Sequence, residues 1–156
     1  MPSAPVSQRL HLADPEATRE LGRRLGAAAR AGDVIALVGP LGAGKTELAR
    51  GIARGLGVAG PVSSPTFVLI AEHEGRLPLF HADAYRLDGP ADALAAGILD
   101  ERRADGVTVI EWAERLGAAL PAGRLEIRLE GAGDEPREAT LTATDEPHAR
   151  LLGSVP

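Results

Sequence analysis

A glycine-rich loop between two regular segments constrains the fold of this chain more than any other feature. Residues Gly39–Thr46, with the sequence GPLGAGKT, fit the pattern G-x-x-x-x-G-K-[ST]. Residues 33–38 before the loop are short and apolar, which predicts a strand buried on both faces. Residues 44–56 after it predict a helix that Gly57 ends. Strand, loop and helix N-terminus therefore follow one another as a phosphate-binding site requires.

The residue types in this loop suit nucleotide phosphates. Glycine lets the main chain approach a phosphate closely, and the following helix adds its positive dipole end. Lys45 is the only lysine among 17 lysine and arginine residues, and its compact ammonium group can bridge the β- and γ-phosphates. The Thr46 hydroxyl can take one magnesium position. The residues expected to bind the nucleotide here are Gly39, Leu41, Gly42, Ala43, Gly44, Lys45 and Thr46.

The rest of the chain predicts a single α/β domain over residues 1–144. A helix is expected from Asp14 to Arg30, and a hairpin from the segments 67–73 and 77–82. A short helix is expected at 90–99 and a buried strand at 107–110. A helical segment at 113–120 and alternating strands at 124–129 and 138–144 follow, and residues 145–156 predict a flexible tail.

Two carboxylates come directly after apolar strands. Glu111 follows Val107–Ile110, and Asp83 follows Leu77–Ala82. A phosphate loop needs such a carboxylate at the end of a neighbouring strand to hold magnesium, directly or through water. If Glu111 supports the metal, Asp83 is available to orient or activate the attacking water, or to share the metal. A solvated charge at a strand end is the simpler alternative for each.

Other polar and aromatic residues near these carboxylates carry weaker signals. Thr66 lies in a proline-containing loop, where it either senses the γ-phosphate or belongs to an ordinary turn. His81 and Tyr85 flank Asp83 and either orient it or pack in the core. Trp112 is the only tryptophan, and its position beside Glu111 suits either core packing or shaping of the site.

Composition excludes several functional classes. The absence of cysteine excludes disulfides, zinc–thiolate sites and thiol catalysis, and it fits a cytoplasmic protein. The N-terminus has no apolar run that suits a signal peptide, and no stretch is long enough to span a membrane. A net charge of −5 argues against autonomous nucleic-acid binding, which needs a basic surface.

Taken together, four motifs in this order resemble the bacterial tRNA threonylcarbamoyladenosine biosynthesis ATPases of the TsaE family. They are the phosphate loop continuing to residue 51, Ser64–Phe67, His81–Leu87 and Ile110–Trp112. The resemblance spans roughly residues 12–144. One departure is Glu47, where the family pattern leads us to expect a second threonine or a similar small residue.

This resemblance implies a three-layer P-loop NTPase fold, with a mainly parallel central sheet flanked by antiparallel strands. It also implies binding of ATP or ADP with Mg²⁺, and ATP hydrolysis that supports turnover of a TsaD–TsaB complex. That complex modifies tRNAs that read ANN codons, and the tRNA itself is contacted mainly by the partners. Residues that the resemblance places at the nucleotide, the metal or the reaction are Lys45, Thr46, Thr66, Asp83, Glu111, Trp112, Arg137 and the segment 14–18.

Two other classes compete with a partner-dependent ATPase. A small-molecule kinase would use the same loop, with Arg102 and Arg103 as possible lid cations, but no segment before Glu111 resembles a substrate lid. A nucleotide-gated binding module would need ATP but would barely hydrolyse it. A GTPase is disfavoured because the guanine motif N-K-x-D cannot occur when the single lysine lies in the phosphate loop. No arginine finger is evident in the chain, so weak hydrolysis by the isolated protein is expected.

Overall fold

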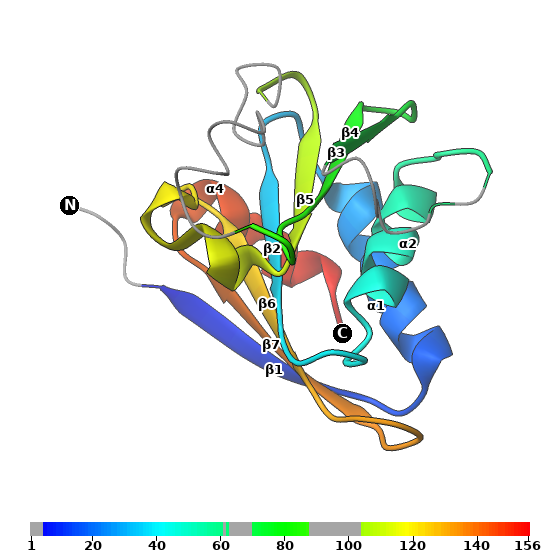
Figure 1. Ribbon diagram of the computed structural model, residues 1–156. Coiled ribbons are helices and arrows are strands. Elements are labelled where there is room, and N and C mark those ends of the chain that lie inside the picture. The colour runs from blue at the N-terminus through cyan, green and yellow to red at the C-terminus, as the bar shows by residue number, and fades with distance from the viewer. Residues whose placement is uncertain (1–4, 61, 63–69, 88–103) are drawn as a thin grey trace.

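One mixed β-sheet organises the chain (Figure 1). The computed structural model describes residues 5–60, 62, 70–87 and 104–156. The strand order is β1-β7-β6-β2-β5-β4-β3, with β6, β2, β5 and β4 parallel and the remaining strands antiparallel at the two edges. This confirms the predicted sheet. The strands are β1 (Val6–Leu12), β2 (Val34–Val38), β3 (Ile70–His73), β4 (Leu79–Asp83), β5 (Val107–Glu111), β6 (Leu125–Glu130) and β7 (Arg137–Ala143).

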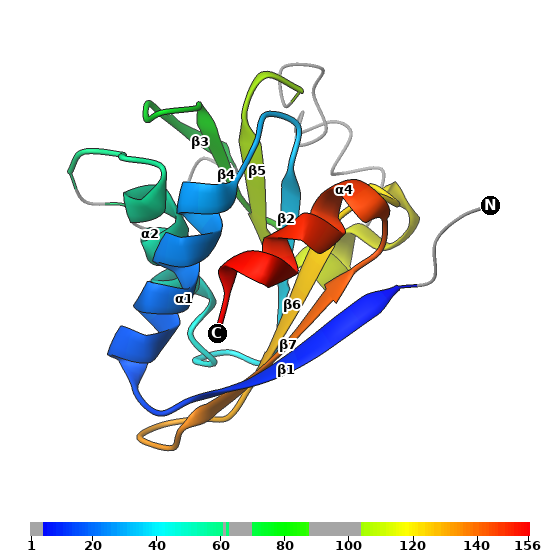
Figure 2. The same ribbon diagram turned by 180° about the vertical axis from the view of Figure 1, so that it is seen from behind.

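Helical segments cover both faces of the sheet. The two views in Figures 1 and 2 show α1, α2, α4 and η3 on one face and η2 on the other. Alternate side chains of β2 enter the two hydrophobic clusters accordingly, with Ile35 and Leu37 toward α1 and α2. β2 is therefore buried on both faces, as predicted. The helical segments are α1 (Pro15–Ala28), α2 (Lys45–Gly55), η2 (Ala113–Ala119), α4 (Glu146–Ala149) and η3 (Arg150–Ser154).

Most local predictions agree with the structure. Asp14 caps α1 by accepting a hydrogen bond from the backbone N–H of Ala17 at 2.8 Å. β3 and β4 form the predicted hairpin, and the segment predicted to be helical at 113–120 forms the 3₁₀ segment η2. The helix predicted at 90–99 and the Thr66 loop lie outside the described residues. Among the described residues, no helix combines the length and the hydrophobicity that a membrane span requires.

The strand β1 was not predicted. It pairs antiparallel with β7 at the edge of the sheet, and most of its side chains are partly or fully exposed. Polar residues such as Ser7 and Arg9 are exposed, and the segment lacks the apolar pattern of a buried strand.

Residues 145–156, predicted to form a flexible tail, form α4 and η3 in the structure. Asp145 caps α4, and its side chain also contacts the Nδ1 atom of the buried His148 at 2.6 Å. Arg150 forms an ion pair with Asp33 at 2.6 Å, and Leu151 is fully buried in the core beside α1. Capping, an ion pair and apolar burial together offset the conformational entropy that ordering this segment costs.

Four glycines bring α1 and α2 into backbone contact. Gly22 and Gly26 on α1 face Gly51 and Gly55 on α2, and both pairs have the one-turn spacing that places residues on one helix face. A Cβ atom at any of the four positions would clash with a carbonyl oxygen of the facing helix. Small residues at such a crossing allow two helices to approach more closely than larger side chains permit.

We expect Gly26→Ala to lower the free energy of unfolding. The new methyl group would clash with the Ile52 carbonyl oxygen, so one helix must shift. Overpacking of this kind costs about 1–3 kcal/mol, more than the gain of at most about 1 kcal/mol in helix propensity. Gly153→Ala is the matched control because nothing lies within 4 Å of its Cβ position. Denaturant unfolding should separate the two variants, and equal stabilities would contradict the close packing.

Candidate nucleotide-binding site

The phosphate loop adopts a conformation that glycine makes possible. Gly39, Gly42 and Gly44 have φ values of 146°, 80° and 104°, a region that other residues rarely occupy. A Cβ atom at Gly39 would also clash with the carbonyl oxygen of Leu129 on β6. Gly44 forms the N-cap of α2, so the loop leads directly into the helix start. The predicted order of strand, loop and helix is confirmed, and backbone amides gather at the positive end of a helix dipole.

Lys45 turns back over its own loop. Its side chain is buried, and the ammonium group donates hydrogen bonds to the carbonyl oxygens of Gly39 at 2.6 Å and Pro40 at 2.8 Å. The neighbouring Leu41 is 77% exposed at the loop tip. The only lysine therefore lies inside the loop, whereas a surface lysine would extend into water.

The surroundings of Lys45 are acidic and aromatic. Its nitrogen lies 3.9 Å from the centroid of the Trp112 ring, within the range of a cation–π contact. Burial lowers the pKa of the ammonium group, and nearby carboxylates act in the opposite direction. These carboxylates belong to Glu114, Glu111 and Asp83. The site thus offers one cation with several acidic groups close by.

Glu111 meets the phosphate loop through Thr46. The Thr46 hydroxyl donates a hydrogen bond to Oε1 of Glu111 at 2.8 Å. The other carboxylate oxygen, Oε2, lies 2.5 Å from Nε2 of His81. Glu111 is only 2% exposed and His81 is fully buried. The predicted strand-end carboxylate is therefore joined to the first turn of α2.

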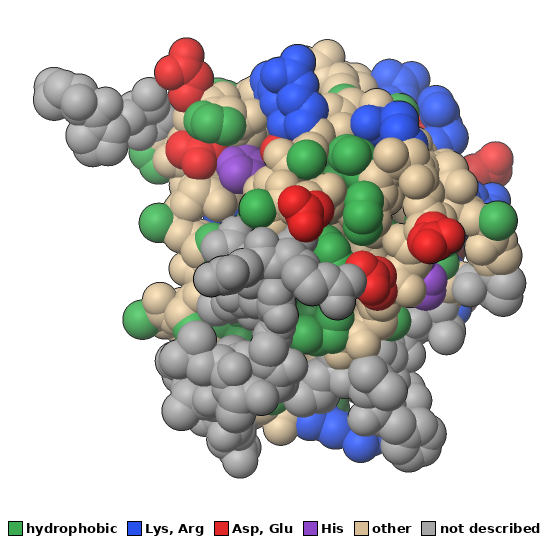
Figure 3. Space-filling model, turned by 90° about the horizontal axis from the view of Figure 1, so that it is seen from above, with side chains coloured by type: hydrophobic (Ala, Val, Ile, Leu, Met, Phe, Trp, Pro, Cys, Tyr) green, Lys and Arg blue, Asp and Glu red, His purple; other side chains and the backbone are tan. Residues whose placement is uncertain are grey.

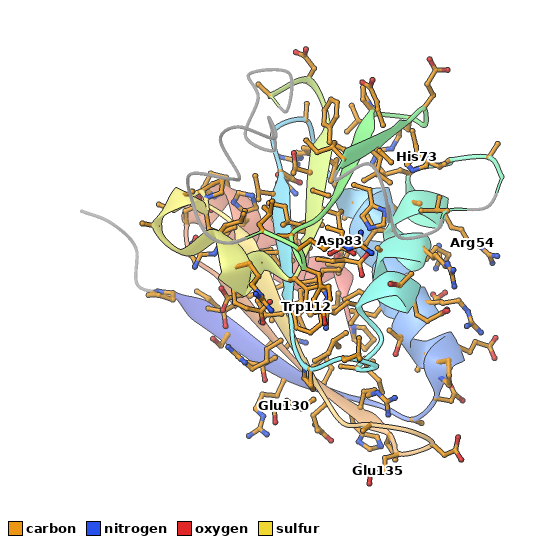
Figure 4. All side chains as sticks on the ribbon, in the orientation of Figure 1. Arg54, His73, Asp83, Trp112, Glu130 and Glu135 are labelled. Carbon is orange, nitrogen blue, oxygen red and sulfur yellow. The ribbon has the colours of Figure 1, made fainter. Side chains whose placement is uncertain are left out.

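Asp83 ends the strand beside Glu111. The register of β4 and β5 pairs Asp83 directly with Glu111, so two carboxylates lie at the same edge of the parallel sheet. Asp83 is half-buried and accepts a hydrogen bond from the backbone N–H of Tyr85 at 2.9 Å. Figure 4 labels Asp83 and Trp112, which both lie at the end of the central strands. The prediction that His81 orients Asp83 is not what the hydrogen bonds show, because its ring contacts Glu111.

Trp112 has an unusual backbone. Its φ of 57° is the one positive value at a non-glycine residue in the described part of the chain. The chain turns there from β5 into η2, and the indole ring packs against Tyr85 with centroids 4.8 Å apart. A bulky residue in the left-handed region is strained and persists only where its surroundings hold it. Packing against Lys45 and Tyr85 fits the second sequence interpretation, in which the tryptophan shapes the site.

A cavity of about 240 Å³ adjoins the other side of the loop. It lies between the loop, the segment 12–18 and the turn that joins β6 to β7, where Figure 4 labels Glu135. Arg137 lines the cavity and donates hydrogen bonds to the carbonyl oxygens of Gly42 and Ala43, each at 3.1 Å. The same guanidinium group also contacts the turn carbonyls of Gly133 and Glu135. Arg137 thus joins loop and turn.

Sequence reasoning missed two groups at the site. The backbone of the β6–β7 turn lines the cavity, although no chemical motif marks it in the sequence. The carboxylate of Glu114, three residues beyond the expected carboxylate, accepts a hydrogen bond from the backbone N–H of Gly39 at 3.4 Å. The one feature of the sequence that could have indicated a role for Glu114 at the site is its proximity to Glu111. Thr66, predicted to lie near the γ-phosphate, is outside the described residues.

Glu47, the departure from the expected loop pattern, joins the two glycine-packed helices. Its carboxylate accepts hydrogen bonds from Arg19 at 2.9 Å and from Arg50 at 2.8 Å. The hydrogen bond from Arg19 is the main cause of the lowered pKa of Glu47. The side chain lines the cavity, and its hydrogen bonds go to Arg19 and Arg50, so it strengthens the α1–α2 contact through Arg19 rather than the phosphate loop.

The donor set suits a metal that is held largely by phosphates. Among the described residues, no three His, Asp or Glu side chains gather closely enough to bind a metal by themselves. Thr46, Glu111 and Asp83 nevertheless supply oxygen atoms at one sheet edge. Mg²⁺ prefers oxygen ligands and is commonly held by one or two protein groups together with substrate phosphates. The residues present therefore fit the predicted magnesium.

Charged side chains are mixed on the face of the molecule shown in Figure 3. Acidic and basic groups alternate there with apolar ones, and the described residues on this face form no broad field of one sign. On this face, therefore, the described residues form no broad basic surface of the kind that nucleic-acid binding needs.

Comparison with known proteins identifies the family. The family model described as "Threonylcarbamoyl adenosine biosynthesis protein TsaE" matches residues 12–139. The tRNA threonylcarbamoyladenosine biosynthesis protein TsaE of Bacillus subtilis is 43% identical over 131 residues, covering 83% of this chain and 82% of that protein. The protein of the same name from Streptomyces coelicolor is 47% identical over 135 residues, with coverages of 82% and 91%.

A solved structure agrees with this assignment. The crystal structure of Bacillus subtilis YdiB superposes with a TM-score of 0.82 and 35% sequence identity, over 97% of this chain and 95% of that one. The family match, the related sequences and the shared fold lead to one conclusion: this chain belongs to the TsaE family, whose role is in tRNA threonylcarbamoyladenosine biosynthesis.

Proposed function

We propose that this protein is a magnesium-dependent ATPase that acts with TsaD and TsaB in tRNA threonylcarbamoyladenosine biosynthesis in the cytoplasm. The observation that carries the proposal is the hydrogen bond from Thr46 to Glu111 beside the buried Lys45. It joins a phosphate loop to a strand-end carboxylate, which is the minimum arrangement for binding and cleaving a nucleoside triphosphate. Hydrolysis would support repeated turnover of the partner complex.

The loop residues would bind the phosphates. Two loop carbonyl oxygens hold the ammonium group of Lys45 in place. From this position the ammonium group can reach between the β- and γ-phosphates. Thr46 donates its only hydroxyl proton to Glu111, which leaves its oxygen lone pairs available to a cation. Bound magnesium would neutralise charge on the phosphates. Glu111 would support the metal mainly by orienting Thr46, whose hydroxyl group it already binds.

Asp83 is the candidate for positioning the attacking water. It is more exposed than its register neighbour Glu111, and its carboxylate is fixed by the backbone of Tyr85. A partly solvated carboxylate beside a buried one can accept a proton while the other stays engaged in hydrogen bonds. We therefore assign water orientation to Asp83 and support of the metal site to Glu111.

The cavity behind the loop would receive the adenine. It borders the loop residues 42–44 and is walled by the segment 12–18 and by the β6–β7 turn, so a base attached to loop-bound phosphates could enter it. Arg137 would act there by fixing the loop carbonyls and one wall of the cavity. The missing guanine motif favours adenine over guanine as the base.

Substitution of the lysine tests nucleotide binding. We expect Lys45→Ala to weaken ADP affinity by about 10- to 100-fold, because charge-assisted hydrogen bonds contribute about 1.5–3 kcal/mol. Isothermal titration calorimetry measures the change. Arg9→Ala is the control, because this charge lies on the edge strand β1, away from the loop. Unchanged affinity in the lysine variant would refute the proposed contact.

Substitution of the buried carboxylate separates binding from hydrolysis. We expect Glu111→Ala to lower kcat by at least about 100-fold, as loss of an acid–base or metal-supporting group does. ADP binding in the absence of magnesium should be largely preserved, since the loop amides and Lys45 remain. Phosphate release in the presence of TsaD and TsaB, together with calorimetry, measures both quantities. If magnesium-dependent turnover survived, Asp83 would become the main metal carboxylate.

Partner dependence tests the biological role. We expect a pull-down with the TsaD–TsaB pair to capture this protein in the presence of ATP and to capture less of it without nucleotide. The Lys45→Ala variant should lose the ATP-dependent part of the capture. Hydrolysis by the isolated protein should be slow and should rise when the partners are added. Capture that ignores ATP, or turnover that ignores the partners, would contradict the proposed role.

A further inference from the structure

We infer that His81 is a positioning residue that holds Glu111 in the orientation needed to support Thr46. This inference rests on the proposed ATPase function. His81, Glu111 and Thr46 form one continuous chain of side-chain hydrogen bonds from β4 through β5 to α2. Sequence proximity had associated the histidine with Asp83, two residues away, whereas the structure connects it to the carboxylate of the neighbouring strand.

Strand geometry explains this connection. His81 is opposite Val109 in the β4–β5 register, and Glu111 is opposite Asp83. His81 and Glu111 are therefore diagonal neighbours on one face of the sheet, a separation that long side chains can span. Their ring nitrogen and carboxylate oxygen meet at 2.5 Å. The contact between His81 and Glu111 therefore follows from the register of the parallel strands β4 and β5.

The chemistry of the pair assigns the proton. An ionised carboxylate only accepts hydrogen bonds, so with Glu111 ionised, Nε2 of His81 carries the hydrogen that Oε2 receives. Thr46 supplies a donor to the other oxygen, so each carboxylate oxygen has its own donor. A carboxylate that is 2% exposed needs such donors, because burial of an unpaired charge is costly. With both in place, rotation of the carboxylate is restricted.

The histidine itself has few other polar contacts. Its side chain is fully buried, and its Nδ1 atom has no hydrogen-bond partner among the residues that the structure describes. An imidazole that served only to fill the core would gain nothing from an unpartnered buried nitrogen, which costs free energy. The hydrogen bond to Glu111 offsets this cost. A side chain of similar size that has no hydrogen-bond donor would lose this bond.

Three substitutions at this position distinguish positioning from packing. In His81→Gln the side-chain amide nitrogen is as many bonds from Cβ as Nε2 is, so it can donate to Glu111. In His81→Asn the amide corresponds to Nδ1 and falls short, and His81→Leu removes the donor. We expect the Asn and Leu variants to lose about 10- to 100-fold in kcat with TsaD and TsaB, with KM little changed, and the Gln variant to recover most of it.

A double substitution tests whether His81 acts through Glu111. In a Glu111→Gln background, His81→Asn should cause no further loss of turnover, because the group that it positions is already changed. His11→Asn is the control, since this histidine lies on the edge strand β1 and pairs with Glu138. Full additivity of the two losses, or wild-type turnover in the Leu variant, would overturn the inference.

Two further measurements do not depend on hydrolysis. Nitrogen-15 NMR of the imidazole, assigned with the His81→Gln variant, should show the Nε2–H tautomer, and a ring protonated at Nδ1 alone would overturn the inference. The Mg²⁺ concentration needed for half-maximal enhancement of ADP binding should rise about 10- to 100-fold in the Asn and Leu variants but not in the Gln variant. If the wild type failed to hydrolyse ATP with its partners, the proposed function would fall, while these two results would still decide the role of His81.

Discussion

The hydrogen bond between Thr46 and Glu111 is the interaction on which the site depends. It connects the first turn of α2 to the end of β5, two elements that meet only in the folded state. Because the carboxylate is buried, it must have donors, and the same donors fix where its oxygen atoms lie. The hydrogen bonds that the buried carboxylate of Glu111 requires thus also order the site. This hydrogen bond holds the phosphate loop in place at its C-terminal end.

The packing of α1 against α2 supports this arrangement from outside. The four facing glycines let the helices approach closely, and Glu47 adds an ion pair with Arg19 across the two helices. α1 begins at Pro15, and its cap Asp14 lines the cavity behind the loop, so a shift of α1 would change the cavity wall as well. Helix packing and the shape of the cavity are therefore coupled through geometry. A glycine that contributes no side chain still determines where the loop lies relative to the segment 12–18.

The sequence was most informative where local chemistry decides structure. The phosphate loop, its flanking strand and helix, and the carboxylates Asp83 and Glu111 were predictable, because glycine conformation and strand ends leave strong local patterns. The hydrogen-bond partner of His81 was not predictable, since it depends on the register between β4 and β5. His81 and Glu111 are 30 positions apart in the sequence. The contacts of Arg137 with the loop carbonyls were hidden for the same reason, as they join residues more than 90 positions apart.

The C-terminal segment shows how a local signal can be present and still be insufficient. Asp145 and Pro147 repeat the cap and early proline that indicated α1, yet residues 145–156 were predicted to form a flexible tail. What orders them is the central strand, because Nε2 of His148 accepts a hydrogen bond from the backbone N–H of Val34 at 3.0 Å. Glu114 accepts one from Gly39 just beyond the other end of β2. Side chains thus hold both ends of the strand that carries the phosphate loop, and the segment predicted to be flexible supplies one of them.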